Sequence, residues 1–158
     1  MKLDGLIVRE AQPQDYDALL ALEQEVVEAE RPFNADLKEA GVRYYDIHKL
    51  ISDQSTMMIV AELSGAIVAT GYMQVRDSKS SLTHDKHGYL GFMYVAQEYR
   101  GLGLNKTVVQ DLVDWGQARG IRHFYLDVYA DNAAAIRAYE KFGFQPSLIE
   151  MKLVSSTG

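Results

Sequence analysis

The feature that most constrains this chain is an apolar strand that runs into a glycine turn and then a helix. Residues 89–95 are uninterruptedly apolar and aromatic, Gly101 and Gly103 follow, and apolar residues then recur at helical spacing up to 119. The first amides of a helix have no internal acceptors and lie at its positive end, so they can hold a phosphate group. The pattern predicts a phosphate-binding loop at 100–106, although the same glycines would also suit a strand–helix turn without a ligand.

Two familiar phosphate motifs are absent from this segment. A dinucleotide fingerprint would need glycine where Lys106 stands, and a P-loop would need glycine in place of Asn105 before Lys106 and Thr107. The segment therefore gives little support to a nucleotide triphosphatase or a dinucleotide oxidoreductase.

The periodicity along the chain predicts a mixed α/β (α+β) fold around a central sheet, in a single domain spanning residues 1–158. The expected order is β-α-α-β-β-β-α-β-α-β. The strands are expected at 6–8, 57–63, 66–75, 89–95, 124–129 and 144–154, and the helices at 13–29, 37–51, 104–119 and 132–142. Ser64 and Gly65 predict a tight hairpin between two of the strands.

Composition narrows the function classes. The chain has no cysteine, which excludes disulfides, thiolate metal sites and a cysteine nucleophile. Its net charge of -6 disfavours nucleic acid and anionic membranes as partners. The charged first ten residues do not resemble a secretory signal, and no stretch approaches the roughly 20 apolar residues that span a bilayer. We expect a cytoplasmic protein. His84 and His87 are a weak metal signal, and we expect no metal.

Two blocks in the second half of the chain resemble the GCN5-related N-acetyltransferase (GNAT) superfamily. The run Arg100-Gly101-Leu102-Gly103-Leu104-Asn105 resembles the family's Arg/Gln-x-x-Gly-x-Gly/Ala, and residues 132–144 resemble Asn-x-x-Ala-x-x-x-Tyr-x-x-x-Gly-Phe. The resemblance is strong over 57–154, weaker over 6–30 and absent between 31 and 56. Two blocks in the right order are more specific than either alone.

The resemblance implies a GNAT-like sheet with helices on both faces and two splayed parallel strands, 89–95 and 124–129. It implies an N-acetyltransferase that passes the acetyl group of acetyl-CoA to a primary amine by direct attack in a ternary complex. The compact length favours a small-molecule acceptor. A homodimer is also expected from the family.

The resemblance also assigns roles to individual residues. The backbone of Met93 and Val95 would pair with the acetyl carbonyl and the pantetheine arm. Tyr139 would act as the acid at the CoA sulfur, and Asn132 would contact the pantetheine or phosphate region. The pyrophosphate would be held by the following residues: Arg100, Gly101, Leu102, Gly103, Leu104, Asn105 and Lys106.

The chain departs from the family pattern at two positions. Asn105 stands where glycine or alanine is usual, and Gly91 occupies the slot of the glutamate that serves many members as general base. Asp127 is the first carboxylate to test as the general base, and an ordered water is the alternative base. The position of Asp127 is equally compatible with a solvated or salt-bridged side chain that has no role in catalysis. Glu28 and Glu30 could attract a cationic acceptor, although such a run is commonly a solvated helix face.

Three other functions stay open at this stage. The departures at positions 91 and 105 would suit an inactive acyl-CoA-binding sensor module. A protein N-terminal or lysine acetyltransferase fits the same motifs. A protein-interaction domain without a cofactor would leave both motif blocks unexplained.

Overall fold

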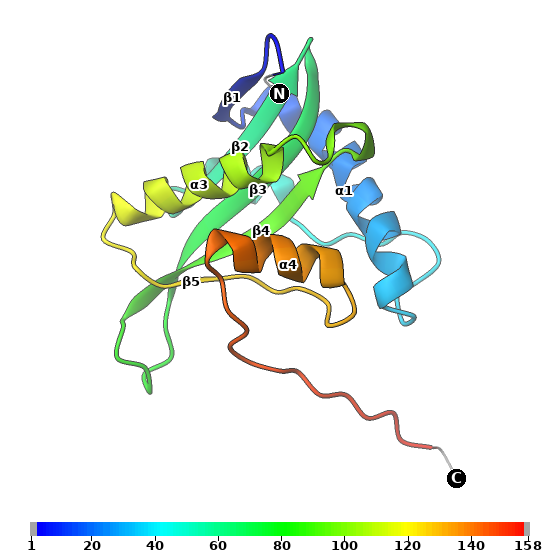
Figure 1. Cartoon of the computed structure of the whole chain (residues 1–158), viewed down its shortest axis with the longest axis vertical. Helices are drawn as coiled ribbons and strands as arrows, with labels where there is room; N and C mark the ends of the chain where they lie inside the picture. The colour runs from blue at the N-terminus through cyan, green and yellow to red at the C-terminus, as the bar shows by residue number, and fades with distance from the viewer. Residues whose placement is uncertain (1–2, 157–158) are drawn as a thin grey trace. The chain divides into compact units, whose positions relative to one another are not determined.

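The computed structural model describes residues 3–156. Its elements follow the chain in the order strand, helix, helix, three strands, helix, strand, helix (Figure 1). The strands are β1 (Ile7–Glu10), β2 (Thr56–Leu63), β3 (Ala66–Asp77), β4 (Lys86–Val95) and β5 (Phe124–Tyr125). The α-helices are α1 (Tyr16–Glu30), α2 (Ile47–Ser52), α3 (Leu104–Gln117) and α4 (Ala133–Phe142), and 3-10 turns cover Pro13–Asp15, Arg31–Phe33 and Gln97–Tyr99.

The five strands form one sheet in the order β1-β2-β3-β4-β5. The first four pair antiparallel, and β5 pairs parallel to β4. The predicted hairpin joins β2 to β3, with Ser64 at φ 51° and Gly65 at φ 82°. Two successive residues in the left-handed region match the right-handed twist of the flanking strands. The mixed α/β fold class is thereby confirmed.

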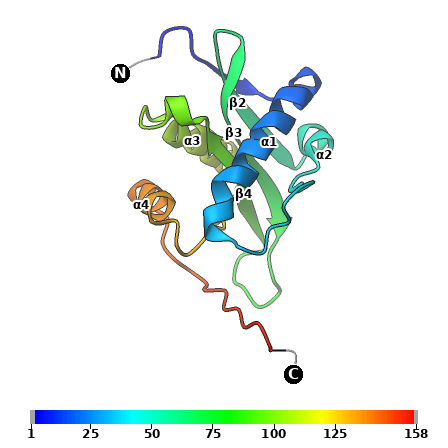
Figure 2. The ribbon, with the colours of Figure 1, turned by 90° about the vertical axis from the view of Figure 1, so that its right-hand side faces the viewer.

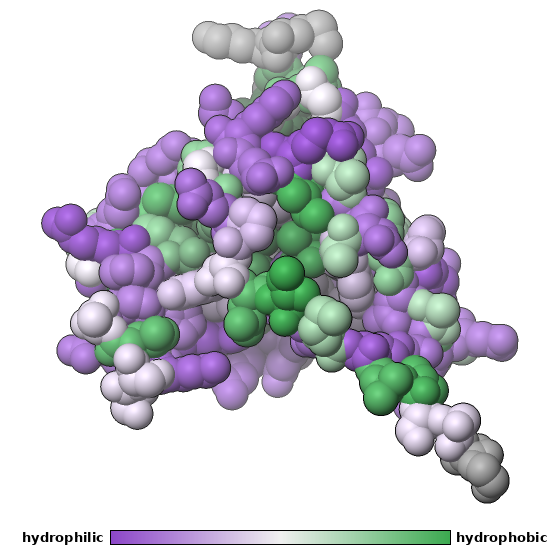
Figure 3. All heavy atoms as spheres, turned by 60° about the horizontal axis from the view of Figure 1, so that its bottom comes forward, coloured by the Kyte–Doolittle hydropathy of each residue, from purple (hydrophilic) through white to green (hydrophobic). Residues whose placement is uncertain are grey.

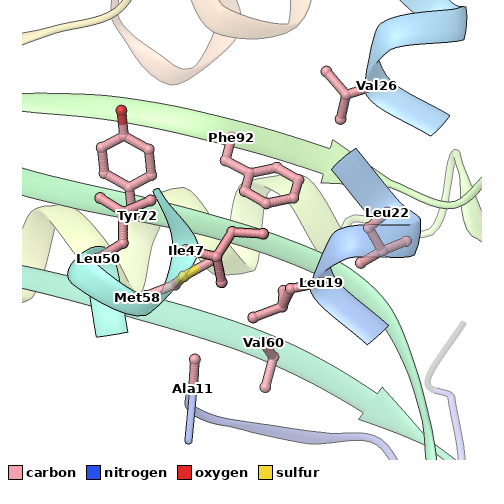
Figure 4. Packing of buried hydrophobic residues seen from close by; sticks show 10 residues of the cluster. All are labelled: Ala11, Leu19, Leu22, Val26, Ile47, Leu50, Met58, Val60, Tyr72 and Phe92. Carbon is pink, nitrogen blue, oxygen red and sulfur yellow. The ribbon is translucent and has the colours of Figure 1, made fainter. Parts of the chain in front are cut away.

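Helices cover both faces of the sheet (Figure 2). On one face α1 and α2 pack with Tyr72 and Phe92 into an apolar cluster (Figure 4). On the other face α3 lies against Met73, the neighbour of Tyr72 in β3. Successive side chains of a strand point to opposite faces. Tyr72 therefore packs on the α1–α2 face, and Met73 packs on the α3 face.

Three close-packed residues fix the distance between α3 and the sheet. Met73 of β3 is fully buried. A Cβ added at Gly88 of β4 or at Gly116 of α3 would fall 2.8 Å from its sulfur. The two glycines therefore let the helix and the strand close over one methionine.

The second helix is much shorter than the predicted span 37–51. It begins only after Asp46, whose side chain accepts a hydrogen bond from the Lys49 amide at 3.2 Å and caps it. The preceding amides of Tyr44 and Tyr45 donate to the buried Glu23 carboxylate, so they have a partner outside any helix. The prediction failed because a tertiary carboxylate competes with helical carbonyls for these donors.

The end of the chain also differs from the prediction. The strand expected over 124–129 stops at Tyr125, and the strand expected over 144–154 is not formed. The apolar side chains of Leu148, Ile149 and Met151 are exposed instead. Figure 3 shows hydrophobic atoms, in green, at the surface of the face that it draws. Alternating apolar residues predict a strand only where a neighbour completes its hydrogen bonds, and no strand of residues 3–156 pairs with this segment.

The described chain divides into two compact units at Asp127 and Val128. The first holds the sheet with α1, α2 and α3. The second holds α4, which lies within the predicted span 132–142 and has Asn132 as its N-cap and Gly143 as its C-cap. The outermost residues of the expected 1–158 domain lie outside the described residues. Within 3–156, no helix has the length and apolar character needed to cross a membrane.

Candidate active site

The glycine turn after β4 has the backbone predicted for a phosphate loop. Gly101 and Gly103 adopt φ angles of 80° and 82°, in the left-handed region that side chains other than glycine rarely enter. Gly103 is the N-cap of α3, which begins at Leu104. The buried Leu104 side chain anchors this first turn against the sheet.

The first turn of α3 has amides without helical acceptors. The Thr107 amide donates to the Gly103 carbonyl at 3.1 Å, which starts the helical hydrogen-bond pattern. The amides of Leu104, Asn105 and Lys106 precede it and have no helical carbonyl to reach. Asn105 is half-buried and Lys106 is exposed, so the added charge lies on the solvent side of the turn.

Arg100 braces the junction between strand and loop. Its Nε donates to the Val95 carbonyl at 3.0 Å, and its Cζ lies 5.3 Å from the centroid of the Tyr94 ring. Leu102 is half-buried between the two glycines. The positive guanidinium thus sits at the end of β4, next to the loop.

The two parallel strands part early. β4 and β5 pair only at Gly88–Phe124 and Tyr89–Tyr125, whereas β4 continues to Val95. The register of β4 against β3 shifts opposite Phe92, whose φ is 51°. Such a bulge bends a strand and increases its twist. Met93 and Val95 therefore lie where the outer edge of β4 has no strand partner within residues 3–156.

A tyrosine ring fills the space beside the glycine that departs from the family pattern. A Cβ added at Gly91 would fall on the ring and hydroxyl of Tyr72, from the neighbouring strand. Any side chain at position 91 would have to displace that ring. The phenol of Tyr72 therefore takes the place of a side chain at 91, and its hydroxyl points away from the apolar cluster (Figure 4).

Asp127 is joined to this part of the sheet by Tyr89. The Tyr89 hydroxyl donates to Asp127 Oδ2 at 2.8 Å. Burial, and then the hydrogen bond to Asp127, raise the pKa of Tyr89 above its usual range. Asp127 lies beyond the end of β5 and not on the strand, which corrects the predicted placement.

The remaining predicted site residues belong to the second unit. The Asn132 side chain accepts from the Ala135 amide at 3.2 Å and caps α4. Tyr139 is half-buried on α4, and its ring meets Phe144 edge-on at 5.9 Å. Both residues are thus accommodated in a short, well-capped helix.

The histidine pair is part of a hydrogen-bonded cluster. Ser78 Oγ lies 2.7 Å from His84 Nδ1 and 2.9 Å from His87 Nδ1, and His84 Nε2 lies 3.0 Å from the Tyr125 hydroxyl. Burial lowers the pKa of His87. Across residues 3–156, histidines and carboxylates nowhere gather in a group of three that could hold a metal ion.

Sequence reasoning missed a small cavity on the α1–α2 face of the sheet. Its volume is about 190 Å³. It is lined by Tyr44, Tyr45, Asp46, Lys49, Leu50, Tyr72, Gln74 and Arg76. The Tyr44–Tyr45 doublet was the available signal, in a region without a readable motif.

Solved structures share this fold. A mutant protein from Bacillus halodurans superposes with a TM-score of 0.85 at 21% identity, covering 95% of this chain and 99% of its own. An acetyltransferase from Clostridium acetobutylicum, crystallised with acetyl-CoA, gives a TM-score of 0.72 at 19% identity, covering 94% and 96%. At these identities the likeness concerns the fold.

The class defined by this fold and loop is that of the acetyl-group transferases. The acetyltransferase (GNAT) family description matches residues 19–144, and the chain belongs to that family. Glucosamine 6-phosphate N-acetyltransferase of Arabidopsis thaliana is 30% identical over 114 residues, or 72% of this chain and 74% of the relative.

Two further relatives match over shorter stretches. An uncharacterized N-acetyltransferase of Bacillus subtilis is 37% identical over 62 residues, which are 39% of this chain and 25% of that protein. The ribosomal protein bS18-alanine N-acetyltransferase of Escherichia coli is 35% identical over 63 residues, 40% and 43% respectively. The chain thus matches less than half the length of these two relatives.

Proposed function

We propose that this protein transfers the acetyl group of acetyl-CoA to a primary amine. The observation that carries the proposal is the position of the α3 first-turn amides directly after the open edge of β4. A helix N-terminus suits the pyrophosphate of CoA, and an unpaired strand edge suits the amide groups of its pantetheine arm. Gly101 to Lys106, with Arg100, form the pyrophosphate site in this proposal, and Met93 and Val95 the edge.

The reaction runs by direct attack within a ternary complex. The amine nitrogen attacks the thioester carbonyl carbon, a C–N bond forms, and negative charge develops on the carbonyl oxygen. A backbone amide on the β4 edge near Met93 stabilises that oxyanion. The tetrahedral species then collapses as the C–S bond breaks, and the electron pair leaves on sulfur. Holding both reactants together supplies much of the rate.

Two protons must move during the reaction. The acceptor ammonium loses one before attack, and Asp127, reached through Tyr89 or a water, is the proposed acceptor of that proton. The departing thiolate takes one from the Tyr139 hydroxyl, and the amide nitrogen then loses its second proton, which restores that hydroxyl directly or through a water. Asn132 contacts the CoA arm in this proposal. The roles proposed for Tyr139 and Asn132 rest on the resemblance of residues 132–144 to the family block.

A small-molecule amine is the acceptor that we favour. The Arabidopsis relative, which this chain matches over most of both lengths, is named for a sugar phosphate. The Escherichia coli relative is named for an alanine of a ribosomal protein, so acetylation of a protein N-terminus or lysine is the second candidate. A cytoplasmic homodimer remains part of the proposal, and light scattering that gives a monomer mass at micromolar concentration would count against the dimer.

Calorimetric titration with acetyl-CoA, with free CoA and ATP alongside, tests the proposal first. We expect micromolar binding of acetyl-CoA and none of ATP. Binding without turnover on any amine would favour the sensor alternative. Absence of acetyl-CoA binding would exclude both the acetyltransferase proposal and the sensor alternative.

A further inference from the structure

Two cations line the small cavity on the α1–α2 face without a carboxylate partner. Among residues 3–156, the ion pairs involve other basic side chains, and neither Lys49 nor Arg76 takes part in one. Arg76 Nε donates to Gln74 Oε1 at 2.8 Å, and both residues line the cavity. With Asp46, the charged side chains of the lining sum to +1 (two cations and one carboxylate) in a chain of net charge -6, so the cavity is locally positive.

The negative group of the cavity is already engaged. The carboxylate of Asp46 caps α2 by accepting from the Lys49 amide. The other walls are mainly the rings of Tyr44, Tyr45 and Tyr72. The ring of Tyr45 is held by stacking on Phe92 at 4.4 Å, so this wall is a fixed surface.

The cavity adjoins the proposed transfer position. Its wall residue Tyr72 is the ring that lies over Gly91 of β4. Arg76 acts on the pKa of Tyr72, and its Cζ lies 4.0 Å from the centroid of Tyr89, the partner of Asp127. Arg76 therefore lies beside β4, next to the strand edge where the amine would attack.

The cavity has room for a small polar group. Its volume is about 190 Å³, and two of its lining residues, Lys49 and Arg76, are exposed to solvent. A charged head group with a few carbons fits this space.

We propose that this cavity binds the acceptor, and that the acceptor is a small amine carrying an anionic group, a carboxylate or a phosphate, held by Arg76 and Lys49. A guanidinium presents parallel donors that match either oxyanion. The tyrosine rings contact the body of the molecule, and the amine points to the β4 edge beside Gly91. The inference rests on the proposed function and names its substrate class.

Matched acceptor pairs test the inference. Glucosamine 6-phosphate is compared with glucosamine, and phenylalanine with its amide, so that one pair reports on a phosphate and the other on a carboxylate. We measure kcat/KM for each member with the wild-type protein and with Arg76→Gln, Lys49→Gln and the control Lys79→Gln. Lys79 is an exposed lysine in the β3–β4 loop and does not line the cavity.

We expect the wild type to prefer the anionic member of at least one pair. Arg76→Gln and Lys49→Gln should each reduce that preference about tenfold, the loss typical of a charge-assisted hydrogen bond. Lys79→Gln should keep the preference. Acetyl-CoA affinity and melting temperature, measured on every variant, show whether the fold and the donor site are intact.

The other outcomes overturn the inference in distinguishable ways. Equal or better use of the neutral members by the wild type removes the anionic class. A preference that survives both Arg76→Gln and Lys49→Gln removes this cavity as its source. Absence of turnover on every amine, despite acetyl-CoA binding, defeats the proposed function itself and the inference with it.

Discussion

The fully buried carboxylate of Glu23 in α1 accepts a hydrogen bond from the backbone amide of Tyr44, at 2.7 Å. Its Oε2 also receives the Tyr45 amide at 2.8 Å, and its Oε1 receives Arg43 Nε at 2.7 Å. One side chain of the first helix thus fixes the extended segment that carries two walls of the acceptor cavity. This part of the cavity wall is thereby tied to a buried side chain of α1.

Glu23→Gln should destabilise the protein. The side-chain NH2 group of glutamine would replace one acceptor oxygen of Glu23. It would then face N–H donors of Arg43, Tyr44 or Tyr45, which would lose their acceptor. We expect the free energy of unfolding to fall by about 2 kcal/mol, the cost typical of a buried hydrogen-bonding group that loses its partner. The control Glu28→Gln removes the same charge from an exposed partner of Arg31 and should cost less than about 1 kcal/mol. Urea denaturation measures both, and equal losses would contradict the anchoring role.

Gly103→Ala should weaken acetyl-CoA binding. The Cβ meets no atom within 4 Å, so the cost arises from the left-handed backbone alone, about 1–2 kcal/mol. Gly120 follows α3 with φ 81° and equally open surroundings, which makes Gly120→Ala a matched control. We expect both variants to lose similar stability in denaturation. Only Gly103→Ala should also lose acetyl-CoA affinity, several-fold, in calorimetry. An equal loss of affinity in both variants would argue against the loop as the pyrophosphate site.

Tyr139→Phe should lower kcat and leave acetyl-CoA affinity nearly unchanged. The substitution removes the hydroxyl proposed to protonate the thiolate while keeping the ring against Phe144. General acid catalysis typically contributes about 100-fold or more, and we expect a loss of that order. Tyr129→Phe, in the same unit, is the control. Steady-state rates with saturating acetyl-CoA decide, and unchanged turnover would remove Tyr139 from the mechanism.

Stability should fall in acid because of Asp15. A paired hydrogen bond from Arg9, at 2.8 and 2.9 Å, and one from the Gln12 amide lower the pKa of Asp15 in the folded state. A carboxyl with a lowered folded pKa contributes stability above its unfolded pKa of about 3.9 and loses it as the pH falls through the folded pKa.

Asp15→Asn removes this titration. The unfolding free energy of the wild type should therefore drop more between pH 7 and pH 3 than that of the variant. Chemical denaturation at the two pH values measures this drop. An equal drop in the wild type and the variant would show that Asp15 does not cause the loss of stability in acid.

The elements that sequence predicted well are those whose hydrogen bonds and packing are local. The Ser64–Gly65 turn, the helix after Gly103 and the cap at Asn132 follow from short-range rules that the structure obeys. The helix expected before Asp46 failed because Glu23, some twenty residues away in the sequence, supplies acceptors to its amides. A long-range partner of this kind leaves no local pattern.

In the candidate site, too, the parts formed by contiguous residues were predicted, and those formed by residues far apart in the sequence were not. The glycine turn and the helix that begins at Leu104 could be predicted because they are contiguous in the sequence. Tyr72 could not be connected with Gly91 without the register of β3 on β4. Arg76 and Lys49 likewise come from separate elements and meet only at the cavity. The acceptor side of the site was therefore beyond sequence reasoning.

The contact of Met73 with Gly88 and Gly116 has a consequence for how this chain can change. The Met73 sulfur and the Phe124 ring together occupy the volume that a side chain at either glycine would need. A larger residue at Gly88 or Gly116 requires room from Met73 and Phe124, and a shorter residue at 73 leaves a cavity unless a glycine is replaced by a larger residue. Substitutions at these four positions should therefore be correlated in related chains.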